Sequence, residues 1–319
     1  MKTPILPLCL LACASLATAQ DESQKPQYDD GSIVVPAARA DESILPAFSS
    51  SAADHHLRDG ALAWSESKSC ISCHTNGAYL TMRPALTPWL GRPENRLREF
   101  ALAELAKLKN TDPDMLQKGT RPAQAIYIAA GLAEWDRHVT KTLSPETREA
   151  LEFMFSLQQD TGSWASLDCW PPYESDAYHL ATVAAMAAGT APDWLESARS
   201  ERVAAGLEKL KRYLTSTEPP HDYGRTLLLW ASCRFPGLLD EAGKASIVDR
   251  LKELQRADGG WSIRSFASPE AWGKGNRAEK LRSEPEFAKP PSDGHQTGLA
   301  VVVLREAGLP VSDVAIQHG

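Results

Sequence analysis

LQQDTGSW at residues 157–164 and LQRADGGW at residues 254–261 share the pattern Gln-x-x-x-Gly-x-Trp. Each follows a stretch whose apolar residues recur at helical spacing. The glycine allows the positive φ that ends a helix. The tryptophan can cover the helix end, and the glutamine can bind exposed carbonyl groups or the next repeat. We therefore predict that both stretches are structural turns and carry no catalytic group.

The sequence after each turn repeats as well. An irregular stretch ends in Pro-Pro, at 171–172 or at 290–291, and a Ser-Asp pair then opens another helix at 175–176 or 292–293. Between the two copies, AAGLEKLKRYL and DYGRTLLLWASCRFPG supply a further helix pair without this turn. Helical hairpins of this size bury their apolar faces only against neighbouring repeats. We therefore expect stacked hairpins.

Helical spacing begins near residue 56, and long alternating β-branched runs are absent, so we predict an all-α fold. The expected organisation is a signal peptide over 1–19, a flexible linker over 20–53, a segment carrying a Cys-x-x-Cys-His motif over 54–95, and helical hairpins over 96–315.

The first residues are typical of an export signal. Lys2 precedes an apolar run too short to span a membrane, and Ala17-Thr18-Ala19 is a cleavage site of small residues. We expect a periplasmic or secreted protein without an integral membrane span. A weak lipoprotein-like sequence leaves open a lipid anchor at Cys13. The net charge of -7 argues against a nucleic-acid partner.

The segment SCISCHTN contains Cys70, Cys73 and His74. In c-type cytochromes, two such thiols form thioether bonds with the haem vinyl groups, and the adjacent histidine is an axial iron ligand. This attachment requires export, which the predicted signal peptide provides. We therefore predict one covalent haem c at these three residues. The alternatives are a Cys70–Cys73 disulfide and a zinc half-site, although no second cysteine pair at zinc spacing follows.

The second axial ligand of this haem is open. The candidates are Met82, His55, His56, His179 and His295. Methionine or histidine in this position is typical of electron transfer. An open position would favour peroxide or small-ligand chemistry.

Asp176 and Asp293 recur at the starts of the two repeated Ser-Asp helices, each just before a histidine, His179 or His295. Their simplest role is helix N-capping. If these helix starts face a cavity, the two Asp-His pairs are candidate catalytic acid–base groups or metal ligands. Elsewhere in the mature chain, Cys169 and Cys233 either form a disulfide or are buried as small apolar residues.

The paired turns resemble the QW repeats of the squalene–hopene cyclase and prenyltransferase superfamily. The resemblance covers about residues 140–310 and implies an α/α toroid, a barrel of inner and outer helices around a cavity. A Cys-x-x-Cys-His segment ahead of such repeats also resembles exported toroid proteins of planctomycete-type bacteria. The Asp-x-Asp-Asp acid of the cyclases is missing, and Asp168 and Cys169 are adjacent instead of separated as in the zinc site of the prenyltransferases. The resemblance therefore implies the fold and neither activity.

Together these features predict an exported monohaem redox protein on a toroid. It would transfer electrons to or from a redox partner protein, or oxidise a small hydrophobic molecule held in the barrel. The alternatives are a haem-free toroid that binds a ligand or partner, and a cyclase- or lyase-like enzyme using the cavity Asp and His residues. The insertion over 262–291 is expected at one mouth of the toroid as a lid, a partner surface or a solvated loop.

Overall fold

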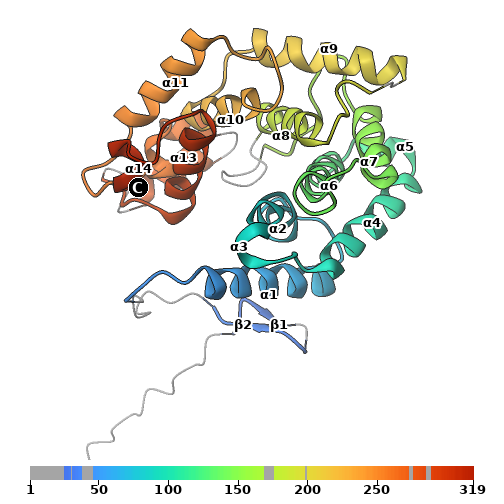
Figure 1. Cartoon of the computed structure of the whole chain (residues 1–319), viewed down its shortest axis with the longest axis horizontal. Coiled ribbons are helices and arrows are strands. Elements are labelled where there is room, and N and C mark those ends of the chain that lie inside the picture. The colour runs from blue at the N-terminus through green and yellow to red at the C-terminus, as the bar shows by residue number, and fades with distance from the viewer. Residues whose placement is uncertain are drawn as a thin grey trace, which may run out of the picture.

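The computed structural model describes residues 25–29, 31–37, 46–168, 176–197, 200–272, 276–284 and 289–319. These residues are mostly helical and include one short β-hairpin, which confirms the all-α fold class. Figure 1 shows the helices following one another around an arc, with α1–α3 at one end and α13–α14 at the other. No helix within the described ranges is long and apolar enough to cross a membrane.

The inner row of the arc consists of helices that are apolar on most of their surface. In α8, every residue from Tyr178 to Ala188 is buried, because neighbouring elements cover the helix on all sides. The inner helices pack against one another in chain order. They are α2 (Asn76–Met82), α6 (Arg121–Trp135), α8 (Ala177–Thr190), α10 (Asp222–Ser232) and α13 (Gly294–Glu306).

The outer row consists of amphipathic helices. In α9, the buried residues Val203, Leu207 and Leu210 recur at three- and four-residue spacing, and exposed charged residues cover the opposite side. The outer helices α4, α7, α9 and α11 each connect two inner helices in the chain, whereas α1 precedes the first inner helix and α14 follows the last. The outer helices are α1 (Ser50–Lys68), α4 (Asn95–Lys109), α7 (Pro145–Ser156), α9 (Glu201–Ser216), α11 (Glu241–Glu253) and α14 (Val314–His318).

Short elements connect these rows. They are η1 (Arg83–Leu86), α3 (Thr87–Leu90), α5 (Pro113–Leu116), η2 (Asp136–Thr140), η3 (Ile263–Ser265), η4 (Pro269–Trp272) and α12 (Arg277–Ser283).

Part of the expected linker over 20–53 is ordered. The strands β1 (Tyr28–Asp29) and β2 (Val34–Val35) pair antiparallel and pack on α1. Val35 is buried, and the Tyr28 ring meets the Trp64 ring edge-on at 5.8 Å between centroids. These apolar contacts hold the hairpin against α1 although its sequence lacks a periodic pattern.

The first Gln-Gly-Trp turn has the predicted structure. Gly162 has a φ of 94°, a conformation that favours glycine. The fully buried Trp164 donates from Nε1 to the carbonyl of Met154 in α7 at 2.9 Å. Gln158 Nε2 donates to the carbonyls of Gly162 and Gly206, each at 3.0 Å. The glutamine therefore joins its own turn to the next outer helix, α9.

The second turn repeats this arrangement. Gly259 has a φ of 91°. Trp261 Nε1 donates to the carbonyl of Leu251 in α11 at 2.8 Å. Gln255 Nε2 donates to the carbonyls of Gly259 at 2.6 Å and Ala315 at 2.9 Å. Both turns are therefore structural connections between neighbouring hairpins, as the sequence predicts.

The described parts of the 262–291 insertion are packed against the molecule. Phe266, Trp272 and Leu281 are buried. The Trp272 ring lies 4.4 Å from the ring of His221, centroid to centroid, at the start of α10. The expectation of a solvated loop is therefore wrong for this part of the insertion, because its aromatic residues anchor it to the inner row.

Three predictions fall wholly or partly outside the described residues. The signal peptide over 1–19 and the Cys13 anchor lie there, and so does Cys169, so its pairing with Cys233 stays a prediction. Cys233 is partly buried, and its Sγ donates to the carbonyl of Leu229 at 3.2 Å. Burial raises the pKa of the Cys233 thiol.

Candidate functional site

The inner helices run in the same direction. The hydroxyl of Tyr127, in the N-terminal half of α6, lies 3.2 Å from Nε2 of His179, near the start of α8. Beyond the ends of these helices, Arg234 donates to Thr190 Oγ1 at 2.9 Å and also contacts Glu134. The N-terminal halves of α6 and α8 therefore lie side by side, and so do their C-terminal ends.

A cavity of about 360 Å³, here called the central cavity, lies between these parallel helices. Because the helices are parallel, residues one or two turns apart line it in layers. The layer at the helix starts contains Tyr127, His179, Tyr223 and His295. The middle layer contains Ala130, Val183, Leu227 and Leu299. The layer at the helix ends contains Glu134, Met186, Trp230 and Val302.

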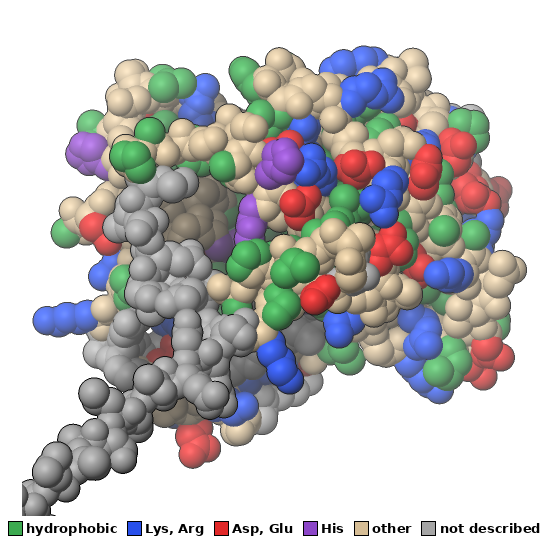
Figure 2. All heavy atoms as spheres, turned by 90° about the horizontal axis from the view of Figure 1, so that it is seen from below, with side chains coloured by type: hydrophobic (Ala, Val, Ile, Leu, Met, Phe, Trp, Pro, Cys, Tyr) green, Lys and Arg blue, Asp and Glu red, His purple; other side chains and the backbone are tan. Residues whose placement is uncertain are grey.

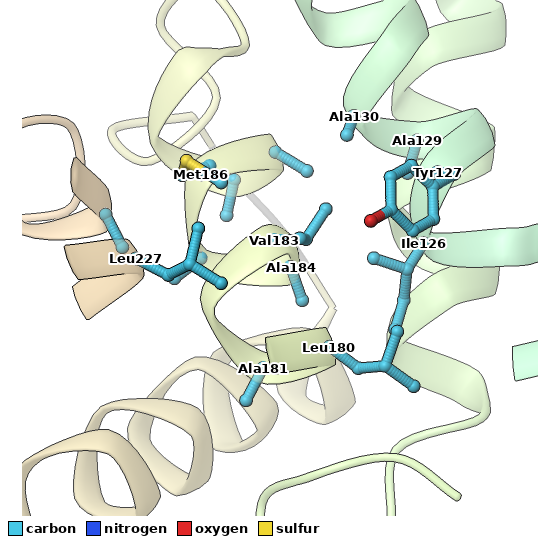
Figure 3. Close-up of a cluster of buried hydrophobic side chains, with 14 of the residues drawn as sticks. Ile126, Tyr127, Ala129, Ala130, Leu180, Ala181, Val183, Ala184, Met186 and Leu227 are labelled. Atoms are coloured by element: carbon cyan, nitrogen blue, oxygen red, sulfur yellow. The ribbon is translucent and has the colours of Figure 1, made fainter. Parts of the chain in front are cut away.

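Figure 3 shows the contact between α6, α8 and α10 in this region. The Tyr127 side chain of α6 extends toward Val183 of α8, and Met186 and Leu227 lie on the opposite side. The middle layer of the central cavity is therefore aliphatic, and the polar residues of these three layers lie in the two end layers.

The layer at the helix starts brings together groups far apart in the sequence. The His179 and Tyr223 rings meet edge-on, with centroids 5.6 Å apart, and Cys73 lines the same cavity. Burial strongly raises the pKa of Tyr223, and the charges of Cys73 and Asp176 raise it further. Tyr223 is therefore a neutral hydroxyl at physiological pH.

Asp176 is the N-cap of α8. Its Oδ1 accepts from the backbone N–H of His179 at 2.7 Å, and its Oδ2 lies 3.4 Å from Nε2 of His221. His221 Nδ1 accepts from the N–H of Gly224 at 3.0 Å, so the neutral ring carries its proton on Nε2 and donates it toward Asp176. Burial raises the pKa of Asp176, but the bonds from His221 and the His179 amide outweigh this effect, and the net shift is downward.

Asp293 has the matching role in α13. Its Oδ1 accepts from the N–H of Gln296 at 2.7 Å, and its Oδ2 accepts from the N–H of Ile263 at 2.8 Å. Both predicted carboxylates therefore cap helices, and their histidine neighbours line the central cavity instead. Desolvation lowers the pKa of His295, and the charge of Asp293 partly offsets this shift.

A buried ion cluster closes the layer at the helix ends. Arg234 pairs with Glu134 and, at 3.1 Å, with Glu306. Its guanidinium carbon lies 5.6 Å from the centroid of the Trp230 ring. Burial disfavours the charge of Arg234, but the two carboxylates outweigh this effect and raise its pKa.

A second cavity of about 360 Å³, here called the α1 cavity, lies among α1, the β-hairpin and the α2–α3 segment. His74 lines it, and so do His56 and Met82. Met82 and Ala78 also line the central cavity, so α2 separates the two cavities. His55, the other histidine of the pair, interacts with Arg58, with 2.8 Å between its Nδ1 and the guanidinium.

The α1 cavity has large apolar side chains exposed at its wall. Phe48 is 86% exposed, Leu57 60% and Leu86 42%. Figure 2 views the molecule from the side of α1 and shows hydrophobic and histidine side chains next to one another on this face. An apolar occupant would remove this surface from water, which is favourable by about 25 cal/mol per Å².

The Cys-x-x-Cys-His residues face three different spaces. His74 Nδ1 lies 2.9 Å from Ser72 Oγ, and Cys73 Sγ lies 3.7 Å from the same nitrogen. Cys73 lines the central cavity and His74 the α1 cavity, whereas Cys70 lines a separate polar hollow. The segment from Cys70 to His74 is not helical.

The fit to a covalent haem can be judged from these positions. A ligating histidine usually has its second ring nitrogen hydrogen-bonded to a neighbouring group, and His74 has Ser72 in this position. The apolar wall of the α1 cavity also matches the apolar surface of a haem. Attachment through both thioethers would require Cys70 to turn from its hollow toward Cys73. Within the described ranges, no group of three or more His, Cys, Asp or Glu residues is arranged to hold a metal ion.

Sequence reasoning missed Tyr127, Tyr223, Glu134 and His221. The signal in the sequence was a pair of polar side chains on one face of a mostly apolar helix, as in Tyr127 and Glu134 of α6, which are seven residues apart. No protein-family model matches the chain, and no curated protein matches it either.

Proposed function

We propose that this protein is an exported monohaem c-type redox protein whose helical arc is a variant of the α/α toroid. In this proposal, Cys70, Cys73 and His74 hold the haem, and the α1 cavity encloses it. The observation that carries the proposal is that His74 faces a cavity whose wall exposes Phe48 and Leu57. A bound haem would cover these apolar side chains.

The residues around the α1 cavity have separable roles in this proposal. Ser72 would orient the His74 ring, which would serve as one axial ligand. His56 and Met82 line the same cavity and are the candidates for the second axial position. The bound haem would supply one-electron transfer.

The central cavity is the proposed site for a small hydrophobic substrate. Ala78 and Met82 of α2 line both cavities, so a substrate would lie within about one helix diameter, roughly 10 Å, of the haem. The Tyr127–His179 pair would accept a proton released from a part of the substrate that lies in the layer at the helix starts. A redox partner protein would receive the electrons.

An absorption spectrum of the full chain, expressed in a periplasm with haem-attachment machinery, tests this proposal. We expect a Soret band that survives denaturation and a mass that includes one haem. Cys73→Ala should weaken covalent attachment, whereas Cys233→Ala, a matched change outside the motif, should leave it intact. A colourless protein with the mass of the bare chain would refute the haem assignment.

The axial ligands can be tested in the same preparation. His56→Ala should change the reduced spectrum and the reduction potential if His56 is the second ligand, and Met82→Leu should do so if Met82 is. His55→Ala is the matched control for the histidine, because His55 pairs with Arg58. If all three variants keep the wild-type spectrum, neither side chain is the ligand.

A second candidate function is supported by the separate positions of Cys70 and Cys73. In this alternative, the chain is a haem-free binding protein that holds a small molecule in the central cavity. It should be colourless, and loss of both thiols together should leave ligand binding unchanged.

A further inference from the structure

The indole N–H of Trp230 lacks a hydrogen-bond acceptor. Trp230 lines the central cavity at the layer of helix ends and is 9% exposed. Its Nε1 has no hydrogen-bond partner among the described residues and is shielded from solvent. A buried donor without an acceptor is destabilising, so such groups in proteins are usually satisfied by a ligand, water or another residue.

An acceptor on Glu134 lies in the same corner of the cavity. The Oε1 of Glu134 is occupied by Arg234 and, at 3.4 Å, by Thr190. Its Oε2 makes no hydrogen bond within the described ranges, although Nε2 of His138 lies 3.3 Å away outside hydrogen-bond geometry. Arg234 contacts Oε1 of Glu134 and lies over the Trp230 ring, so both side chains are next to the same guanidinium.

We propose that this corner of the central cavity binds the hydroxyl group of a small aliphatic alcohol. A hydroxyl can accept from the Trp230 N–H and donate to Glu134 Oε2 at the same time. A carbonyl or ether oxygen would satisfy only Trp230, and an ammonium group only Glu134. Of these four groups, the hydroxyl is the one that satisfies both Trp230 and Glu134.

The rest of the cavity selects an aliphatic body for this ligand. Val183, Leu227 and Leu299 form the layer next to the corner and offer no polar group. The volume of about 360 Å³ suits a short alkyl chain extending from the hydroxyl toward Tyr127 and His179. The assignment therefore names the substrate class, a small aliphatic alcohol. It rests on the proposed function for the role of this cavity as the substrate site.

Calorimetric titration of the full-length protein with n-hexanol and methyl pentyl ether tests the assignment. The two compounds are isomers, but only the alcohol can donate. The wild type should bind n-hexanol on the order of tenfold more tightly than the ether, the value of one hydrogen bond to a charged acceptor. Trp230→Phe should weaken the binding of both compounds, again on the order of tenfold, because both accept a hydrogen bond from the indole.

Trp89→Phe is the matched control, since Trp89 is 77% exposed and lines neither cavity. Trp230→Phe keeps an aromatic ring and the ion cluster, so the fold should survive, and a circular dichroism spectrum checks this. Equal affinity for alcohol and ether, unchanged binding in Trp230→Phe, or no binding of n-hexanol would each overturn the assignment. The Soret band reports on the haem separately. A protein that lacks this band but still prefers the alcohol would refute only the haem assignment.

Discussion

Replacing Gln158 by leucine should destabilise the protein by about 2 kcal/mol. The side chain donates two hydrogen bonds, to the carbonyls of Gly162 and Gly206, each at 3.0 Å. Each is worth about 1 kcal/mol net, and leucine keeps a similar volume while losing both donors. One bond closes the turn and the other joins it to α9, so the substitution also loosens two adjacent hairpins.

The matched control is Gln159→Leu. Gln159 is the next residue in the chain and is exposed, so this substitution should change stability by less than about 0.5 kcal/mol. Gln255→Leu, in the second turn, should cost about as much as Gln158→Leu, since Gln255 also donates to two carbonyls.

Urea unfolding measures these differences. Tryptophan fluorescence and circular dichroism should be recorded together, because a chain of stacked hairpins is treated as two-state only where the two transitions coincide. If Gln158→Leu and Gln159→Leu have the same midpoint and slope, the glutamine bonds do not hold the hairpins together, and the structural account of the turn is refuted.

Three further substitutions test other contacts of the structure. Gly162→Ala should lower the free energy of unfolding by about 1–3 kcal/mol, because Gly162 has a φ of 94° and a Cβ there would overlap a backbone carbonyl of α9. The control is Gly294→Ala, where a Cβ meets nothing within 4 Å, and it should be nearly neutral in the same urea assay. Trp272→Ala should cost about 3–5 kcal/mol if the insertion is anchored through this buried ring, and a loss below about 1 kcal/mol would show that it is not. Folding lowers the pKa of Asp176, so its charge stabilises the fold above about pH 4, and this stabilisation is lost as the pH falls through the folded pKa. Asp176→Asn should therefore reduce the dependence of the unfolding free energy on pH in that range. An unchanged profile of unfolding free energy against pH would contradict the lowered pKa.

The helices and turns could be predicted because their determinants lie close together in the chain. Gln158 bonds a carbonyl four residues away, and Trp164 bonds one ten residues away. Apolar spacing within α9 likewise depends only on residues of that helix. The N-capping role of Asp176 followed in the same way, because the amide it binds is three residues along.

The members of the central cavity could be predicted only in part. The resemblance implied a cavity with His179 and His295 as candidates, and both line it, but Tyr127, Tyr223 and Glu134 were missed because the members come from separate hairpins. Tyr127 and His179 are 52 residues apart, and Glu134 and Arg234 are 100 apart. Their contact depends on the inner helices being parallel and in register, which no local pattern specifies. For the same reason, the pairing of Asp176 with His221 was missed.

The Cys-x-x-Cys-His segment illustrates both cases. Its spacing alone identified the candidate haem residues, because attachment depends on neighbours in the chain. Which space each side chain faces depends on the packing of α1, α2 and α6 around the segment, and this packing directs His74 to the α1 cavity and Cys73 to the central cavity. Helix type and turn chemistry are thus local properties that a sequence encodes directly, whereas a cavity shared by distant helices is set by the way those helices stack.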